Sequence, residues 1–262
     1  MSAGDTDSLL AGAQRLALRY AELRAEAGKV LVPGVVPDEV RGKVRELYSK
    51  VREVDREVER WLEAIPEELS YQTLGWGQSK GTSPPDGLNY GEFEVFPGRV
   101  DVYPDYVTAS AWNVGRVTRL LLASLALRLT AWIHAPVDYR LTSEYEALKL
   151  ICEEIVEDII ASIPFHLGWH LKRKDTGYSG MSSFACGEEG PDKALPAMFL
   201  IWPLTCLKNH DMTEEEQRTW AKGRLKFIAD RVGLKYAHVV NDVGLSFLLV
   251  DRRRKLTVGS ST

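Results

Sequence analysis

The chain has 262 residues, 45% of them hydrophobic and 27% charged, which is typical of a soluble globular protein with a substantial core. The net charge of −4 excludes the basic composition that nucleic-acid-binding domains use against phosphates, so we expect no nucleic acid to bind through this chain. Cys152, Cys186 and Cys206 are too few and too scattered for a disulfide framework or a zinc site. We therefore expect a reducing, intracellular location, either cytoplasmic or nuclear.

Two helices are predicted near the N-terminus. Residues 8–29 have amphipathic periodicity, and Ser8 is the expected N-cap. Residues 37–65 carry apolar side chains at alternating steps of four and three, which places one apolar seam along a long helix before Pro66 ends it. The seam can pack within the domain or against a second chain, and packing within the domain is favoured. Its members are Val40, Val44, Leu47, Val51, Val54, Val58, Trp61 and Ile65.

Residues 66–103 lose this periodicity and are predicted to form a long connection, in which Phe93–Phe96 adds at most a short strand. A helix follows over residues 104–133, with Pro104 in its first turn. It is the most apolar stretch of the chain, yet Arg119 and Arg128 stand in its middle. These charges favour a buried core helix over a membrane span.

The C-terminal half is predicted to contain more helices around a second long loop. Residues 143–163 form a helix that Pro164 ends, and residues 165–192 form a loop rich in Gly and Ser. Three further helices are expected over residues 193–207, 213–232 and 235–251.

The start of the helix over residues 213–232 has the clearest signal, because Thr213 and Glu216 match a capping box. Together these elements predict a single all-α domain over residues 1–262. We expect about seven helices and two long loops.

Three polar residues, Asn113, Arg116 and Arg119, follow one another at spacings of three along one side of the apolar helix. In so apolar a helix some of these groups must be buried, and a buried polar group needs a partner. The partner is either an acid such as Asp101 or Asp105, which would give an internal ion-pair network, or a bound ligand. The internal network is the favoured interpretation.

His166 and His170 stand four residues apart, a spacing that brings two imidazoles to one helix face for zinc. The segment lacks the glutamate of a metalloprotease and contains Gly168, so packing or a hydrogen bond to a ligand is favoured and no metal is expected. The acidic stretch 153–158 is predicted to be a solvated helix face. The sequence has no phosphate-binding loop and no dinucleotide fingerprint, so we expect no cofactor.

Five sequence segments occur in order after residue 100. They are Asp101-Val-Tyr-Pro-Asp-Tyr106, Ala111-Trp-Asn-Val-Gly-Arg-Val-Thr-Arg119, Ile160-Ala-Ser-Ile-Pro-Phe-His-Leu-Gly168, Phe199-Leu-Ile-Trp-Pro-Leu204 and Trp220-Ala-Lys-Gly-Arg-Leu-Lys-Phe-Ile228. Together they resemble the C-terminal regulatory region of fungal binuclear zinc-cluster (Zn2Cys6) transcription factors, over about residues 8–244. The resemblance implies an all-α module that senses metabolites or partners and restrains activation. The family's six closely spaced N-terminal cysteines, which bind DNA through zinc, have no counterpart in this sequence.

Two functions are left open. In the first, a chain without its DNA-binding module acts in fungal secondary metabolism as a cofactor-free cyclase or isomerase. It would be of the pericyclase (Diels–Alderase) type and act on a polyene, terpenoid or polyketide intermediate. The expected catalytic donors are Tyr103, Asn113, Arg116, His166 and His170. The expected walls for a small hydrophobic molecule are Trp112, Trp169, Tyr178 and Trp202.

In the second, the chain is a transcriptional regulatory protein that acts by ligand sensing or partner binding, with the seam of residues 37–65 as its docking surface. Neither hypothesis involves a membrane, and a homodimer is left open. A closed apolar cavity with convergent polar groups would favour the enzyme, whereas a solid core would favour the regulator. The missing DNA-binding module favours the first hypothesis.

Overall fold

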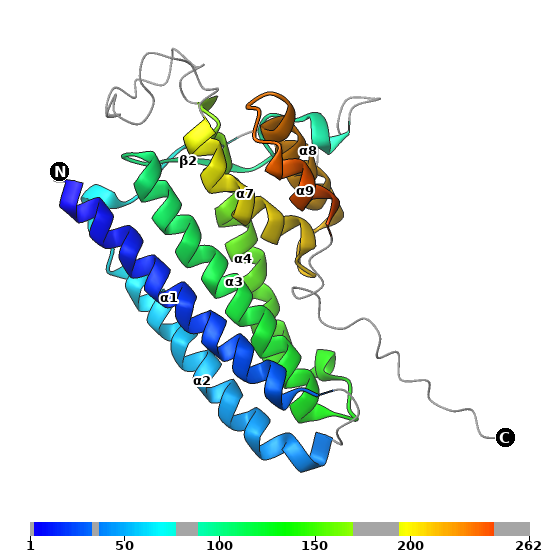
Figure 1. Ribbon diagram of the computed structural model, residues 1–262. Coiled ribbons are helices and arrows are strands. Elements are labelled where there is room, and N and C mark those ends of the chain that lie inside the picture. The colour runs from blue at the N-terminus through cyan, green and yellow to red at the C-terminus, as the bar shows by residue number, and fades with distance from the viewer. Residues whose placement is uncertain (1–2, 33–36, 77–88, 170–193, 244–262) are drawn as a thin grey trace.

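The computed structural model describes residues 3–32, 37–76, 89–169 and 194–243. Within these ranges the fold is mostly helical, as predicted, and four long helices lie side by side while three shorter ones gather at one end (Figure 1). The long helices are α1 (Ala3–Val30), α2 (Pro37–Glu63), α3 (Tyr106–His134) and α4 (Ser143–His166). The shorter ones are α7 (Ala194–Asn209), α8 (Glu215–Asp230) and α9 (Tyr236–Asp242).

Helix α3 is the centre of the bundle. It contacts α1, α2, α4 and α7, and 20 of its 29 residues are buried. Among the described residues it is the one helix long and apolar enough to cross a membrane, but 67% of its most apolar window is covered by the rest of the protein. Burial of this apolar surface is a main stabilising contribution to the fold. The sequence prediction of a buried core helix is therefore confirmed.

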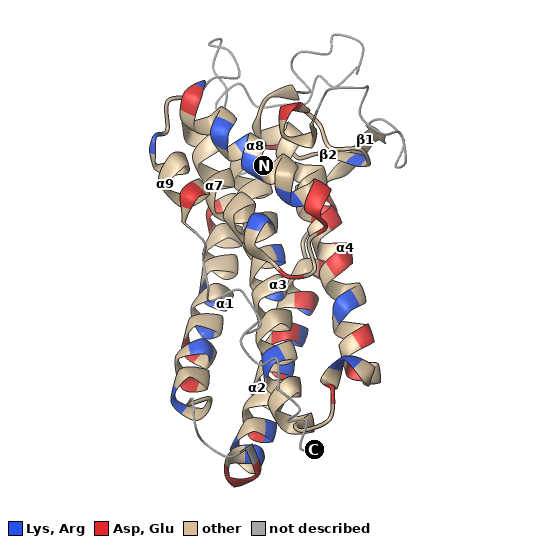
Figure 2. Ribbon diagram, turned by 90° about the vertical axis from the view of Figure 1, so that its right-hand side faces the viewer, with Lys and Arg blue, Asp and Glu red and all other residues tan. Residues whose placement is uncertain are grey.

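The apolar seam of α2 packs inside the molecule. Val44, Leu47, Val51 and Val58 are fully buried, and they belong to the same hydrophobic cluster as the leucines of α3. The other faces of α2 and much of α4 carry charges of both signs, mixed along each helix (Figure 2). Packing within the domain, the favoured sequence prediction, is what the structure shows. The seam is therefore not exposed as a docking surface.

Several predicted helix ends are wrong by a few residues. Helix α1 begins at Ala3, so Ser8 lies inside it and is not its N-cap. Helix α3 begins at Tyr106 and is capped by Asp105, whose Oδ1 accepts a hydrogen bond of 2.7 Å from the Thr108 amide. Pro104 therefore precedes the cap instead of standing in the first turn. An aspartate cap accepts a hydrogen bond from a free amide of the first turn, whereas a proline in that turn only removes one such amide.

Helix α8 also begins differently from the prediction. Its capping box is made by Glu214 and Gln217, whose side chain accepts a hydrogen bond of 2.9 Å from the Glu214 amide. Thr213 is buried one residue earlier and does not cap the helix. Pro164 does not end α4 either, since it lies inside the helix, which runs on to His166. Helix α9 ends at Asp242, whereas the prediction continued the helix to residue 251, which lies outside the described residues.

The connection after α2 is more ordered than predicted. Strand β1 (Gln72–Trp76) pairs antiparallel with β2 (Arg99–Val102), with a register irregularity between Thr73 and Gly75. Phe93–Phe96 is not a strand. The hydrophobic pattern did not predict this two-stranded β-ribbon, because its strands are short and pair across a long stretch of sequence.

Helix α8 is held against the segment before β2, which includes the 3₁₀ turn η2 (Tyr90–Glu92). The Trp220 indole donates a hydrogen bond of 3.0 Å to the Phe93 carbonyl, and Arg224 donates one of 3.2 Å to the Gly91 carbonyl. Gly223 permits this contact, since a Cβ there would stand 2.0 Å from the Gly91 oxygen. The Trp-Ala-Lys-Gly-Arg segment is therefore a docking surface for a main-chain turn.

Candidate functional site

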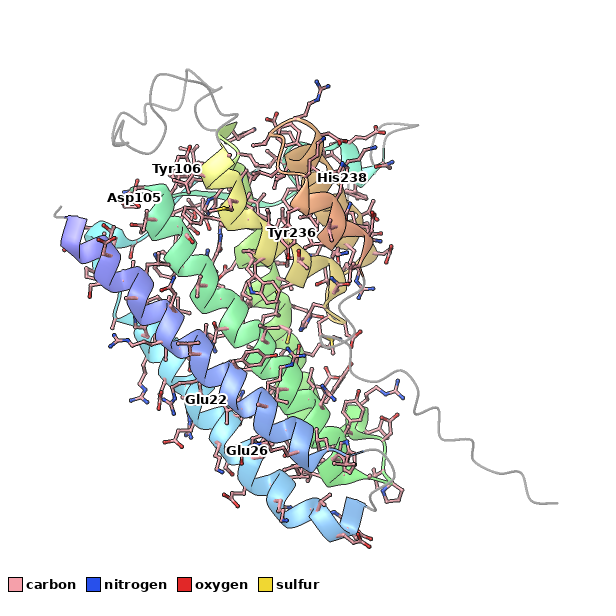
Figure 3. All side chains as sticks on the ribbon, in the orientation of Figure 1. Glu22, Glu26, Asp105, Tyr106, Tyr236 and His238 are labelled. Carbon is pink, nitrogen blue, oxygen red and sulfur yellow. The ribbon has the colours of Figure 1, made fainter. Side chains whose placement is uncertain are left out.

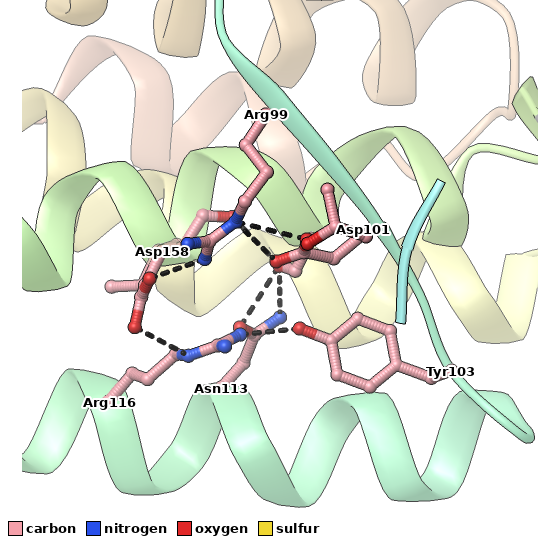
Figure 4. Close-up of polar contacts among 9 residues, drawn as sticks. Arg99, Asp101, Tyr103, Asn113, Arg116 and Asp158 are labelled. Carbon is pink, nitrogen blue, oxygen red and sulfur yellow. Dashed lines mark hydrogen bonds and ion pairs between the residues drawn. The ribbon is translucent and has the colours of Figure 1, made fainter. Parts of the chain in front are cut away.

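A buried polar network lies where β2, α3 and α4 meet, at the same end of the bundle as the shorter helices (Figures 1 and 4). We define it as five residues. Arg99 and Asp101 come from β2, Tyr103 follows that strand, Arg116 comes from α3 and Asp158 from α4. Asp101, Tyr103 and Arg116 are at most 2% exposed. The network therefore joins three elements in the interior.

Each charge of the polar network faces an opposite charge. The Arg99 Nε is 3.0 Å from an Asp101 carboxylate oxygen, and its Nη2 donates to Asp158 at 2.5 Å. Figure 4 shows Arg116 between Asp158 and Tyr103. Its Nη1 donates to the Tyr103 hydroxyl at 2.5 Å, and its Nε is 3.6 Å from an Asp158 oxygen. Two arginines and two aspartates give the network no net charge, which reduces the cost of burying it.

Burial and pairing set the protonation states. Burial raises the pKa of the Tyr103 phenol, so this residue keeps its proton and accepts a bond from Arg116 through its oxygen. Burial disfavours the charge of Arg116, but Tyr103 and Asp158 outweigh this effect and raise its pKa. Burial also raises the pKa of Asp101, against the lowering effect of Arg99 and of the Thr73 hydroxyl, which donates at 2.9 Å.

Aromatic rings enclose Arg116 on its remaining sides. Its guanidinium carbon is 5.0 Å from the ring centre of Tyr71 and 5.2 Å from that of Trp112, distances typical of cation–π contacts. Trp112 is itself held by a hydrogen bond of 3.0 Å from its indole to the Leu69 carbonyl. The buried Nη2 of Arg116 has no hydrogen-bond partner among the described residues. Trp112, predicted as a ligand wall, thus packs on a protein cation.

A second buried group joins α3 to α4. The Asn113 amide nitrogen donates to the Ser162 hydroxyl at 2.9 Å and lies 3.4 Å from Nε2 of His166. An amide nitrogen only donates, so this contact suits the tautomer in which Nε2 accepts. The His166 ring also stacks on Tyr106 and meets Phe199 of α7 edge-on. His166 is therefore surrounded by protein groups from three elements.

Four of the nine sequence-predicted site residues meet in this region: Tyr103, Asn113, Arg116 and His166. Trp112 lies beside them, and Trp169 is half-buried just beyond α4. Trp202 is 44% exposed on α7. His170 and Tyr178 lie outside the described residues, so the predicted His166–His170 pair cannot be placed. The catalytic and ligand-binding roles of all nine stay predictions.

The predicted acid partners need correction. Arg116 pairs with Asp158 and not with Asp101 or Asp105. Arg119 is 3.3 Å from Asp55 and 2.8 Å from Glu59, both on α2. Asp101 binds Arg99, and Asp105 caps α3. The internal ion-pair network was expected, but the acids that pair with Arg116 and Arg119 come from α4 and α2.

Sequence reasoning missed Asp158, which it assigned to a solvated acidic face. A usable signal was present, because Asp158, Ser162 and His166 follow at intervals of four and so share one face of α4. That face meets the similarly spaced Asn113 and Arg116 of α3. Arg99 offered no comparable signal, because its strand was not recognised.

A cleft of about 480 Å³ lies elsewhere, along α1 and α3, and none of the candidate residues that the structure describes lines it. The described part of the chain also holds no group of three His, Cys, Asp or Glu side chains that could bind a metal ion. In the polar network the acids are paired with arginines and the phenol is protonated. Such an arrangement fixes elements relative to one another.

A comparison with curated proteins finds a similar protein in Emericella nidulans, named Transcription factor dbaG. The two are 42% identical over 143 residues, which is 54% of this chain and 31% of the relative. The match thus spans about a third of the relative's length. No protein-family model and no solved structure matches the chain. The chain is therefore similar to a fungal transcription factor over about half of its length.

Proposed function

We propose that this chain is a transcriptional regulatory module of the fungal zinc-cluster type, which acts by binding a small molecule or a partner protein. The observation that carries the proposal is its 42% identity to Transcription factor dbaG over 143 residues. A nuclear site of action is part of the same proposal.

The placement of the resembling segments supports this function. Residues 101–106, 111–119 and 160–168 supply most of the polar network and the Asn113–His166 group. Residues 199–204 add the Phe199 contact, and residues 220–228 form the docking surface for the turn before β2. All five segments therefore hold the fold together, as expected of a framework shared among regulators.

The cyclase hypothesis stays a prediction that no described feature supports. Its candidate donors within the described residues contact protein groups, and they do not line the cleft of about 480 Å³. Fold and framework alone do not establish chemistry. Incubating the protein with linear precursors and finding a changed rate or stereochemistry of cyclisation would revive this hypothesis.

A tethering experiment tests the regulatory function. The chain is inserted between a heterologous DNA-binding domain and an activation domain, and transcription of a reporter gene is measured against the same fusion without the chain. We expect the inserted chain to lower reporter output several-fold at equal protein level, because the resembling family region restrains activation. Equal output with and without the chain would contradict the proposal.

Matched glycine variants control for the fold. Gly223→Ala disturbs the docking of α8, so it should relieve the restraint. Gly42→Ala replaces an exposed glycine of α2 whose added Cβ meets nothing within 4 Å, so it should leave the restraint unchanged. Immunoblotting confirms equal amounts of each fusion.

A further inference from the structure

The cleft along α1 and α3 lies toward the end of the bundle opposite the polar network. Its lining on α1 and just after it runs from Tyr20 to Leu31. Figure 3 labels Glu22 and Glu26 in this stretch, whereas Asp105 and Tyr106 are labelled at the other end. Its volume, about 480 Å³, lies within the range of roughly 300–1,000 Å³ typical of small-molecule sites. The described lining residues are Tyr20, Ala21, Arg24, Ala25, Ala27, Gly28, Leu31, Leu125 and Arg128.

The lining combines positive charge with apolar surface. It holds two arginines, Arg24 and Arg128, and no acid among its described residues. The acids of α1 lie elsewhere: Glu22 and Glu26 occur two positions after Tyr20 and Arg24, on roughly the opposite helix face. Glu26 there binds Lys50 of α2 at 2.9 Å. The cleft therefore favours an anion.

Arg128 is the more informative of the two arginines. It is half-buried on the most apolar helix, and among the described residues it has no hydrogen bond or ion pair. Arg116 and Arg119, on the same helix, are both paired with acids. A partly buried cation without a carboxylate loses solvation without compensation, and a bound anion would supply the missing partner.

Tyr20 adds a neutral donor at the same place. Arg24 and Arg128 both lie close enough to influence its phenol electrostatically, although burial outweighs them and raises its pKa to about 12. The hydroxyl therefore stays protonated and can donate to an acceptor. Beside these donors, Leu31, Leu125 and small α1 residues offer apolar surface. Gly28 leaves the space open, since a Cβ there would meet nothing within 4 Å.

We infer that this cleft binds an amphipathic carboxylate, a small organic acid whose carboxylate lies between Arg24, Arg128 and Tyr20 while its hydrocarbon part lies on Leu31 and Leu125. Arginine matches the planar carboxylate with two parallel donors. The binding of a carboxylate does not depend on the proposed function. Only the role of the ligand, as the signal to which the regulatory module responds, rests on that function.

Isothermal titration of the purified full chain tests the site, with dodecanoate below its micelle concentration as the probe. We expect saturable binding of one dodecanoate per chain. Dodecanol and dodecyltrimethylammonium, which share the tail but not the charge, should bind at least about tenfold more weakly. Equal binding of all three probes would overturn the assignment of a carboxylate.

Three variants locate the probe. Arg128→Gln should weaken dodecanoate binding about tenfold through loss of a charge-assisted hydrogen bond. Gly28→Leu should abolish it by filling the cleft without a main-chain clash. Arg15→Gln, at an exposed α1 residue outside the lining, should bind like the unmodified protein. Wild-type affinity in both cleft variants, with circular dichroism unchanged, would overturn the site.

The reporter fusion separates this inference from the proposed function. Dodecanoate binding without any effect of the chain on transcription would leave the site standing and contradict the regulatory function. If the chain restrains transcription but does not bind dodecanoate, the regulatory function stands and the carboxylate site is overturned.

Discussion

Arg116 is a fully buried cation whose partners come from separate elements. Asp158 of α4 and Tyr103 beyond β2 contact its two ends, and the rings of Tyr71 and Trp112 lie beside it. The sequence predicted that this arginine would be buried and paired, because it stands on the apolar helix three residues from Asn113. Its acid partner depended on which face of α4 packs against α3.

Replacing Arg116 by methionine, which has a similar length, should destabilise the protein by about 3–5 kcal/mol. Asp158 would then share Arg99 with Asp101 as its one remaining cation in the network, and the buried Tyr103 oxygen would lose its donor. Urea unfolding measures the loss. Arg56→Met is the matched control, since Arg56 is exposed and, among the described residues, its side chain donates only to the Arg52 carbonyl. A loss below about 1 kcal/mol for Arg116→Met would show that the network contributes little.

His210 is a second buried residue with a defined state. Its Nδ1 accepts from the Met212 amide at 3.2 Å, so Nε2 carries the proton and donates to the Ser124 hydroxyl of α3 at 2.7 Å. Burial, with a smaller contribution from Arg218, lowers its pKa to about 4 from the ordinary 6.5. His210 thus links the turn after α7 to the central helix in its neutral form.

This pKa predicts acid sensitivity. Because the folded pKa lies below the unfolded one, the unfolded chain takes up a proton first, and stability falls as the pH drops from about 6.5 towards 4. The shift corresponds to about 3 kcal/mol. Unfolding free energies measured across this range should decline less steeply in His210→Gln. Identical slopes in the two proteins would count against the assignment.

At the scale of elements, glycines decide two contacts that side chains alone would not reveal. Gly115 of α3 lies against Trp61 and Leu62 of α2, and a Cβ there would stand 2.9 Å from the indole. Gly223 of α8 lies against the main chain of Gly91. In both contacts the two elements approach closely because glycine has no side chain. A glycine in a helical sequence pattern does not show which element lies against it.

Gly223→Ala should therefore destabilise the protein by about 1–3 kcal/mol, since the new methyl group must displace the turn at Gly91. Displacement would expose Trp220, so its fluorescence should shift to longer wavelength. Gly42→Ala should instead stabilise by about 0.5–1 kcal/mol, as an alanine in an open helix position does. Similar stability of the two variants would contradict the close approach of α8.

At the scale of the whole molecule, the α2 seam is used for packing within one chain. Leu47 is fully buried among core residues, so the seam contributes to the stability of one chain. A seam with the same spacing could equally serve a coiled coil, and the sequence left both uses open. In the structure the seam packs within the chain, because the long apolar surface of α3 covers it.

Leu47→Ala should cost about 2–5 kcal/mol of stability and leave the mass measured by light scattering at the wild-type value. A seam used between chains would instead lower that mass when Leu47 is truncated. Leu18→Ala provides the control, because Leu18 is 65% exposed on α1 and its loss should change stability by no more than about 0.5 kcal/mol.

The sequence by itself determined the helical class, the approximate extent of the long helices and the burial of the central one, because these follow from local periodicity and apolar content. It also required partners for Asn113, Arg116 and Arg119. Only the tertiary structure decided which partners these are, where the ribbon pairs and where the open cleft lies. Such contacts join residues far apart along the chain, as Arg99 and Asp158 are by 59 positions, and depend on how packed elements face one another.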